Sequence, residues 1–350
     1  MLVGLLGLAA CDGWPDLEPS STDTPLDPDL GVELARTPRS FRVASGFDGG
    51  GRLLVLYEDR GAGWSLLRVD PDSGASERLT PPPLAVGDTV APIRAIEPDA
   101  IGYVVIHDGV ATPWLRDGGS WRALPPVPTG EGPVDIGAAL AHDGRVYVAE
   151  GTTAWMWTGD AWIEPVGSSA RVVLGGFDAT TQWMVTARDE DGALAAYPVS
   201  PAGVAGAPVL GPAVGPPVGG ALNGSASSFQ LVAGGAVYVV TPTAITAGDG
   251  VSGTLWSTPG SATTLVSTES DTSSPWTFVV GGAVGEVAVP TVSPMVDCPT
   301  CTPHQVNFYQ ARPSGDASRL ALVMVDADDG YAVMTVRFFD LPLAVDPFAS

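Results

Sequence analysis

The sequence contains no lysine, because all 16 of its basic residues are arginine. They stand against 39 acidic residues in a chain of 350, so the formal net charge is −23. A chain with this balance cannot neutralise a row of phosphates, which excludes nucleic acid as a partner. The lack of lysine also excludes Schiff-base catalysis and phosphate binding by a P-loop.

Helical patterning is missing as well. After about residue 40 the apolar runs are short, rich in valine, threonine and aromatic residues, and closed by glycine, aspartate or proline. That punctuation is typical of strands and turns. Because 45 % of the residues are hydrophobic, there is enough apolar material for a sizeable core. We therefore expect an all-β body.

The apolar runs recur along the chain. Taking one anchor residue per run gives seven anchors at a mean spacing of about 44 residues, which is typical of a β-propeller with several strands per blade. Two neighbouring units also share a tryptophan after a turn, Trp121 and Trp162. The anchors are Tyr57, Tyr103, Tyr147, Trp183, Tyr238, Phe278 and Leu322.

These repeats resemble the β-propeller superfamily in general. Val-x-Gly-Gly segments at 173–176, 232–235 and 279–282 are similar to the kelch double glycine, although the kelch tyrosine and tryptophan do not recur. The resemblance implies a single propeller over residues 41–350 with seven blades, or six if one anchor is miscounted. A pair of β-sandwich domains is the second fold to consider.

The N-terminus carries a different signal. Residues 1–10 are apolar or glycine, too few to span a bilayer, and end in Leu8-Ala9-Ala10-Cys11. This resembles a bacterial lipobox, which implies cleavage of the signal segment before Cys11 and a lipid on that cysteine. Signal segments usually begin with arginine or lysine. Residues 1–10 have neither, which a start codon upstream of Met1 would explain.

Residues 11–40 follow as a predicted tether. Seven acidic residues and four prolines, with no basic residue, lie between positions 12 and 33. Such a segment repels itself and cannot bury apolar area, so we expect a disordered spacer between a membrane and the propeller. The expected location is the bacterial cell envelope, periplasmic or outer surface, with the lipid as the membrane contact.

Cys298 and Cys301 form the most specific motif inside the body. With Cys11 lipidated they are the only thiols left, and in an exported protein a local disulfide is the favoured interpretation. A redox site would need a helix N-terminus, and a zinc site with His304 would lack one ligand. We predict a disulfide, and neither a metal nor a cofactor.

Two further patterns are turn-like. His107 and His142 each precede Asp-Gly, which favours exposed hairpin corners over a metal or acid–base site. The segment 326–330, Asp-Ala-Asp-Asp-Gly, is one residue too short for a calcium loop and favours a hairpin turn.

The segment 192–248 holds no charged residue in 57 positions. Its prolines exclude a membrane helix, so we expect packed blades with uncharged loops, and a solvent-facing patch within it is a possible contact site.

Motifs of common hydrolases and nucleotide-binding enzymes are missing: the sequence has no G-x-S-x-G, H-E-x-x-H or Walker loop. The Asp-box pattern of sialidase-type propellers is approached at 117–121 but is one residue short. We therefore favour a non-catalytic binding or scaffolding module with a protein or glycan partner. The alternative is a propeller enzyme that acts on extracellular glycans or related polymers.

Overall fold

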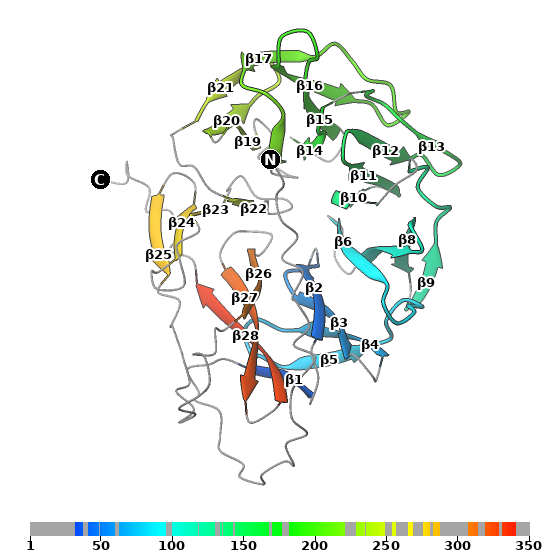
Figure 1. The fold of residues 1–350 in the computed structure, drawn as a ribbon, viewed down its shortest axis with the longest axis vertical. Helices are drawn as coiled ribbons and strands as arrows, with labels where there is room; N and C mark the ends of the chain where they lie inside the picture. The colour runs from blue at the N-terminus through cyan, green and yellow to red at the C-terminus, as the bar shows by residue number, and fades with distance from the viewer. Residues whose placement is uncertain are drawn as a thin grey trace.

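The chain folds into a single β-propeller in which antiparallel sheets circle a common axis (Figure 1). The computed structural model describes residues 32–37, 41–48, 50–59, 63–95, 100–117, 119–129, 134, 136–142, 144–167, 170–176, 182–220, 229–234, 236–248, 254–256, 265–268, 276–280, 283–287, 307–313, 319–328 and 331–340. Within these residues all regular structure is β, as the sequence predicted.

The described strands form seven four-stranded units, which confirms seven blades. Blade 1 comprises β2 (Phe41–Phe47), β3 (Leu53–Asp59), β4 (Gly63–Val69) and β5 (Ser76–Leu79). Blade 2 comprises β6 (Thr89–Ala95), β7 (Ile101–His107), β8 (Val110–Asp117) and β9 (Ser120–Ala123). Blade 3 comprises β10 (Ile136–His142), β11 (Arg145–Glu150), β12 (Thr153–Trp157) and β13 (Trp162–Ile163).

The remaining blades repeat this order from the innermost strand to the outermost. Blade 4 comprises β14 (Val173–Gly176), β15 (Gln182–Ala187), β16 (Ala193–Val199) and β17 (Val209–Ala213). Blade 5 comprises β18 (Pro217–Gly220), β19 (Phe229–Ala233), β20 (Ala236–Val240) and β21 (Ile245–Ala247). Blade 6 comprises β22 (Thr254–Trp256), β23 (Leu265–Thr268), β24 (Trp276–Val280) and β25 (Ala283–Val287).

Blade 7 closes the ring with strands from both ends of the chain. It orders β26 (Asn307–Pro313), β27 (Arg319–Asp328), β28 (Tyr331–Asp340) and, outermost, β1 (Val32–Thr37). β1 pairs antiparallel with β28, from Val32 opposite Val336 to Thr37 opposite Ala332. The ring is thus held shut by a hydrogen-bonded ladder between two segments about 300 residues apart.

β1 corrects the predicted domain boundary. The sequence placed residues 11–40 in the tether and began the propeller at residue 41, but Val32–Thr37 is a strand of blade 7. Its acidic and arginine residues do not fit the apolar pattern by which the sequence predicted strands. An outermost strand can face solvent along one side and carry charged residues there. Residues 11–31 lie outside the described part of the chain.

The seven anchor residues do not all lie on equivalent strands of their blades. Tyr57, Tyr103, Tyr147 and Trp183 lie on second strands, and so does Leu322 in β27. Tyr238 and Phe278 instead lie on the third strands β20 and β24. The long step from Trp183 to Tyr238 therefore includes a shift of one strand. In blade 5 the second-strand residue opposite Tyr238 is Leu231.

The core lies between consecutive blades. On β3, Leu53, Val55 and Tyr57 pack toward blade 7, whereas Leu54 and Leu56 pack toward blade 2. Alternate side chains of a strand point to opposite faces, so a strand inside the ring is apolar at every position. This explains the continuous apolar runs that the sequence shows.

Two faces of the disc follow from the strand directions. We call the side on which the chain passes from one blade to the next the connection face; it also carries the turns between second and third strands. The opposite side, with the other two turns of each blade, is the turn face. Only loops on the same face can contribute residues to one site.

Candidate functional site: a fixed loop between blades 1 and 2

Residues 80–88 connect β5 to β6 on the connection face, and we call them the corner loop. Three prolines at 81–83 open the segment and limit its backbone freedom. Gly87 has a φ of 91°, a conformation that a side chain would strain. Side chains from both neighbouring blades then fix the loop by hydrogen bonds.

Blade 1 provides two of these contacts. The indole Nε1 of Trp64 donates to the carbonyl of Ala85 at 2.9 Å. The backbone N–H of Gly87 donates to Glu58 Oε1 at 3.2 Å. Glu58 is only 1 % exposed, and its second oxygen lies 3.7 Å from the Nε of Arg42. The buried carboxylate therefore has a partner on each oxygen, as burial of a charge requires.

Blade 2 holds the loop from the other side. Trp121 Nε1 donates to the carbonyl of Thr80 at 2.8 Å. Asp88, the last residue of the loop and 5 % exposed, accepts the N–H of Ala85 at 2.7 Å through Oδ2, a bond within the loop itself. Its Oδ1 lies 2.7 Å from His107 Nδ1, at the end of β7. Blade 2 thus holds both ends of the loop, at Thr80 and Asp88, and blade 1 holds its tip, at Ala85 and Gly87.

His107 lies at the corner of the β7–β8 hairpin, with its side chain 62 % exposed. The hydrogen bond to Asp88 and the charges of Asp108 and Asp88 raise the pKa of the imidazole. The Nε2 of His107 is 3.5 Å from Asp108 Oδ2. An imidazole between two carboxylates holds its proton to higher pH than a free one.

Apolar side chains stand beside this polar network. Val86 at the tip of the corner loop is 78 % exposed, and Val110, directly after the β7–β8 turn, is 47 % exposed. They are two of the five large hydrophobic residues that stand exposed among the described side chains. The loop therefore presents an apolar tip on a backbone that is already fixed.

The two histidine motifs lie on opposite faces. His107-Asp108-Gly109 forms the β7–β8 turn on the connection face, with positive φ at Asp108 and Gly109 as a tight hairpin requires. His142 ends β10 and pairs with Arg145 of β11, so this hairpin turns on the turn face. The hairpin interpretation holds for both, and the two cannot share a site.

Of the other predicted sites, the calcium-like segment is a hairpin and the cysteine sites lie outside the described residues. Asp326 and Asp328 belong to β27, which pairs up to Asp328 opposite Tyr331, so the calcium-like segment is a hairpin. Cys11, Cys298, Cys301 and His304 lie outside the described residues. Over the part of the chain that is described, no group of three or more His, Cys, Asp or Glu is arranged to hold a metal.

The repeated tryptophans have a structural role. Trp121 and Trp162 each begin or follow the start of an outermost strand, and each donates its indole N–H to the segment after the preceding blade, at Thr80 and Pro125. The sequence found this repeat by spacing alone. It did not find Asp88 or Glu58, because neither has a distinctive neighbour pattern and each contacts a residue far away along the chain.

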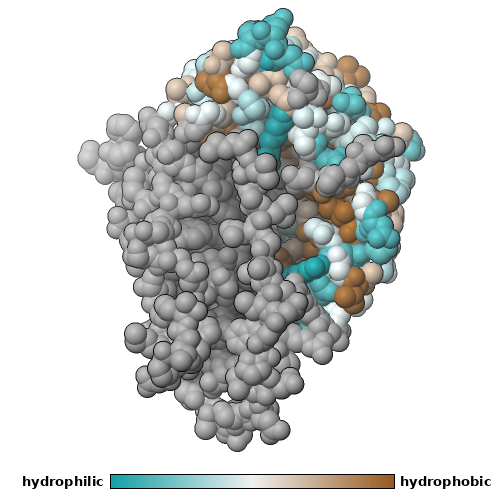
Figure 2. All heavy atoms as spheres, viewed as in Figure 1, coloured by the Kyte–Doolittle hydropathy of each residue, from teal (hydrophilic) through white to brown (hydrophobic). Residues whose placement is uncertain are grey.

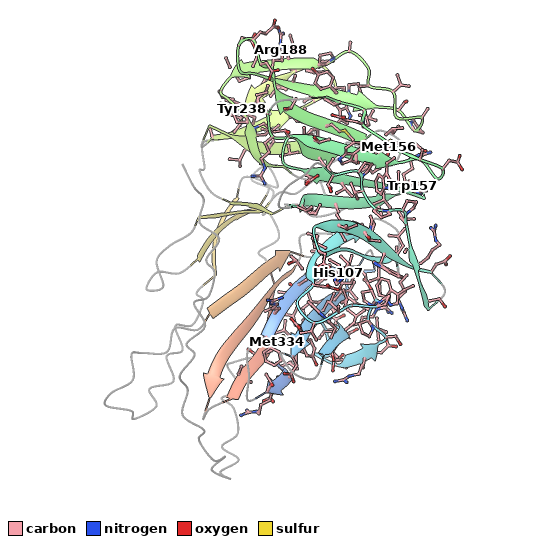
Figure 3. All side chains as sticks on the ribbon, turned by 45° about the vertical axis from the view of Figure 1, so that its right-hand side comes forward. His107, Met156, Trp157, Arg188, Tyr238 and Met334 are labelled. Carbon is pink, nitrogen blue, oxygen red and sulfur yellow. The ribbon has the colours of Figure 1, made fainter. Side chains whose placement is uncertain are left out.

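A second group of charges lies in blade 4. Arg188 in the β15–β16 turn pairs with Glu190 and lies 3.8 Å from Asp191. Figure 3 shows Arg188 at the top of the molecule and His107 in its lower half, so the two groups are separate. The Arg188 pairs join neighbours within one turn, whereas the corner loop joins two blades.

No known protein-family profile matches the chain, and no curated protein matches it in sequence. Among solved structures it is similar to a puromycin-hydrolyzing peptidase of Mycobacterium tuberculosis, with a TM-score of 0.50 and 13 % identity over 88 % of this chain. A second similar structure is TolB from Acinetobacter baumannii, with a TM-score of 0.43 and 13 % identity over 67 % of this chain.

The match covers 54 % of the peptidase and 62 % of TolB, so this chain spans about half of the first and less than two thirds of the second. Identity this low shows a shared fold alone. The β-propeller is established by the ring of sheets and supported by the peptidase. Within the described residues, no helix is long and apolar enough to cross a membrane.

Proposed function

We propose that this protein is a non-catalytic binding or scaffolding module, attached by lipid to the bacterial cell envelope, that docks a partner at the corner loop. One observation carries the proposal: four side chains of the neighbouring blades and the loop's own Asp88 fix a nine-residue loop, while Val86 at its tip stays 78 % exposed. Buried carboxylates that order an exposed loop have no evident role in the apolar packing between blades.

The physical advantage is preorganisation. A flexible loop loses conformational entropy when it binds, about 0.5–1.5 kcal/mol for each side chain that is immobilised. The corner loop has lost that freedom already on folding. An aliphatic tip flanked by polar groups suits a protein segment with an apolar pocket, since interfaces combine an apolar centre with a polar rim. A glycan is the other class that we considered.

Site-specific photo-crosslinking in cells tests this. A photoreactive residue at Val86 should give an adduct of discrete mass, because the tip would lie in the interface. The same residue at Ala75, an exposed position on the turn face of blade 1, is the matched control. Equal adducts from both positions, or none from Val86, would contradict docking at the corner loop.

A second variant separates docking from chance contact. Trp64→Phe removes the hydrogen bond to Ala85 and leaves an aromatic ring in place. If the fixed loop is what the partner recognises, the adduct from position 86 should fall in this variant. Mass spectrometry of the adduct would identify a protein partner, whereas a carbohydrate adduct would favour a glycan.

The lipid anchor is tested separately. In cells fed a palmitate analogue, the parent should be labelled and Cys11→Ser should not, because the thioether needs that sulfur. Cys298→Ser serves as the control for nonspecific thiol labelling. Labelling of Cys11→Ser at the parent level would remove the anchor from the proposal and leave the docking test unaffected.

One observation favours the alternative enzyme. An exposed histidine whose Nδ1 is held by a buried carboxylate, as His107 is by Asp88, is a candidate general base. Purified protein should be assayed on envelope polysaccharides, with His107→Gln as the comparison. Hydrolysis by the parent that His107→Gln loses would favour the enzyme over the binding module.

A further inference from the structure

The outer rim of blades 4 and 5 differs in charge from the rest of the protein. It consists of β17, β21 and the β16–β17 turn at 200–208, all inside the 57-residue segment without a charged residue. The remaining sequence carries all 55 charged residues of the chain and its net charge of −23. The uncharged rim is therefore an area without charge on an otherwise acidic protein.

Apolar groups are exposed there. Val204 is 66 % exposed and Leu210, in β17, is 49 % exposed. Ala207, Pro208, Thr246 and Ala247 are exposed beside them. In Figure 2 pale, tan and brown spheres gather in the upper part of the view, where Figure 1 places β17 and β21, next to a teal group at the top.

The two outer strands form one surface, since β17 and β21 contact each other. A Cβ at Gly211 would lie 2.8 Å from the Cβ of Ile245, so glycine at this position allows the close approach. Among the described strands β17 pairs only with β16, which leaves its other edge open. Open edges are usually protected by charged side chains, and here none is present.

Charge indicates what can cover this surface. Two copies of a protein with a charge of −23 repel each other wherever acidic surfaces meet. At the uncharged rim no like charges meet directly, so the repulsion between the two copies is weakest there, and apolar groups of both copies leave water. When a patch contacts the same patch of a second copy, a two-fold axis relates the two copies. Such a contact forms a dimer and adds no further copies.

We propose that the uncharged rim of blades 4 and 5 is a homodimer interface, with β17 of one copy against β17 of the other. Leu210 then lies near the two-fold axis and faces the same residue of the second copy. Blade 7, where β1 leaves the ring toward the N-terminus, is on the far side of the ring in Figure 1. Dimerisation at the rim therefore leaves β1 and the closure of blade 7 uncovered.

Sedimentation equilibrium of the full chain tests the proposal. The parent should form dimers, and Leu210→Asp should weaken dimerisation by at least about tenfold, since the new carboxylates face each other. Raising the salt concentration from about 0.05 to about 0.5 M should strengthen the parent dimer, because salt screens the repulsion between the acidic bodies. Ala75→Asp, at an exposed position on the turn face of blade 1, should leave dimerisation unchanged.

A mixing experiment gives the sharpest outcome. Leu210→Asp and Leu210→Arg should each be mostly monomeric, and an equal mixture of the two should form a heterodimer across the axis. Thr246→Asp on β21 is a second rim variant in case Leu210→Asp unfolds. A parent that stays monomeric at every concentration, or rim variants that dimerise as the parent does, would overturn the proposal.

Discussion

The outermost strands of this propeller differ between its two sides. β1 carries Glu33 and Arg36, and β5 carries Glu77 and Arg78, whereas β17 and β21 carry no charged residue. All four are outer strands of their blades, so fold position alone does not decide their composition. Charges keep β1 and β5 from pairing with other chains, and the uncharged strands lack that protection.

The two sides also hold their outer strands differently. On the charged side, ion pairs such as Arg36 to Glu33 at 3.1 Å lie on the surface, where they contribute little stability. On the uncharged side, close backbone approach at Gly211 brings β17 onto β21. Even a methyl group at position 211 would crowd Ile245, so this contact requires glycine.

The largest expected loss of stability comes from removing β1, the strand on the charged side that closes the ring. Deleting residues 32–37 uncovers Met334 and Val336, both fully buried beside β1. We expect the free energy of unfolding to fall by about 3 kcal/mol or more, because each buried side chain contributes roughly 1.5–3 kcal/mol. Denaturant unfolding measures this.

A synthetic peptide of residues 28–40 should restore stability to the deleted chain. A peptide of the same composition in scrambled order is the control. If the deleted chain unfolds as the parent does, β1 does not close the ring in the way that the ladder indicates.

The next largest loss of stability is expected on the uncharged side. Gly211→Ala places a methyl group against Ile245 and should cost about 1–3 kcal/mol by overpacking. Gly46→Ala is the matched strand control, since its Cβ would lie at 3.7 Å from Pro92, an ordinary contact. Equal unfolding midpoints for the two variants would show that β17 does not depend on close approach to β21.

Smaller effects are expected from the tryptophans that join outer strands to the preceding connection. Trp121→Phe and Trp162→Phe each remove one hydrogen bond, at a cost of about 1 kcal/mol. The two sites lie in different blades, so the costs should add in the double variant. A double variant no less stable than either single one would show that the bonds are not independent.

The smallest effect is a pH dependence at the corner loop. Since the pKa of His107 is raised on folding, its stabilising effect is present at low pH and is lost as pH rises through the folded pKa. Asp88→Asn should lower the pKa of His107 and weaken this dependence, because the hydrogen bond and charge of Asp88 are lost while the charge of Asp108 remains. NMR titration of the imidazole protons measures it, with His142→Gln and His304→Gln used for assignment.

Parts of the candidate site could be predicted and others could not. The sequence identified His107 as a hairpin corner and Trp121 as part of a repeat, because both signals are local. Glu58 contacts Gly87, 29 residues away along the chain, and Asp88 contacts His107 of blade 2, 19 residues away, so only the folded arrangement of the loop between the two blades brings these groups together. Contacts across blades leave no pattern within either blade.

The fold shows the same division. Composition and the recurrence of apolar runs determined an all-β chain with about 44 residues per unit, because strands buried on both faces must be apolar and must end in turns. Only the tertiary structure decided that β1 completes blade 7, that the His107 and His142 turns face opposite sides, and that the uncharged segment supplies two adjoining outer strands. The physical reason is that local patterns report what a strand buries, whereas closing the ring decides which strands and loops become neighbours.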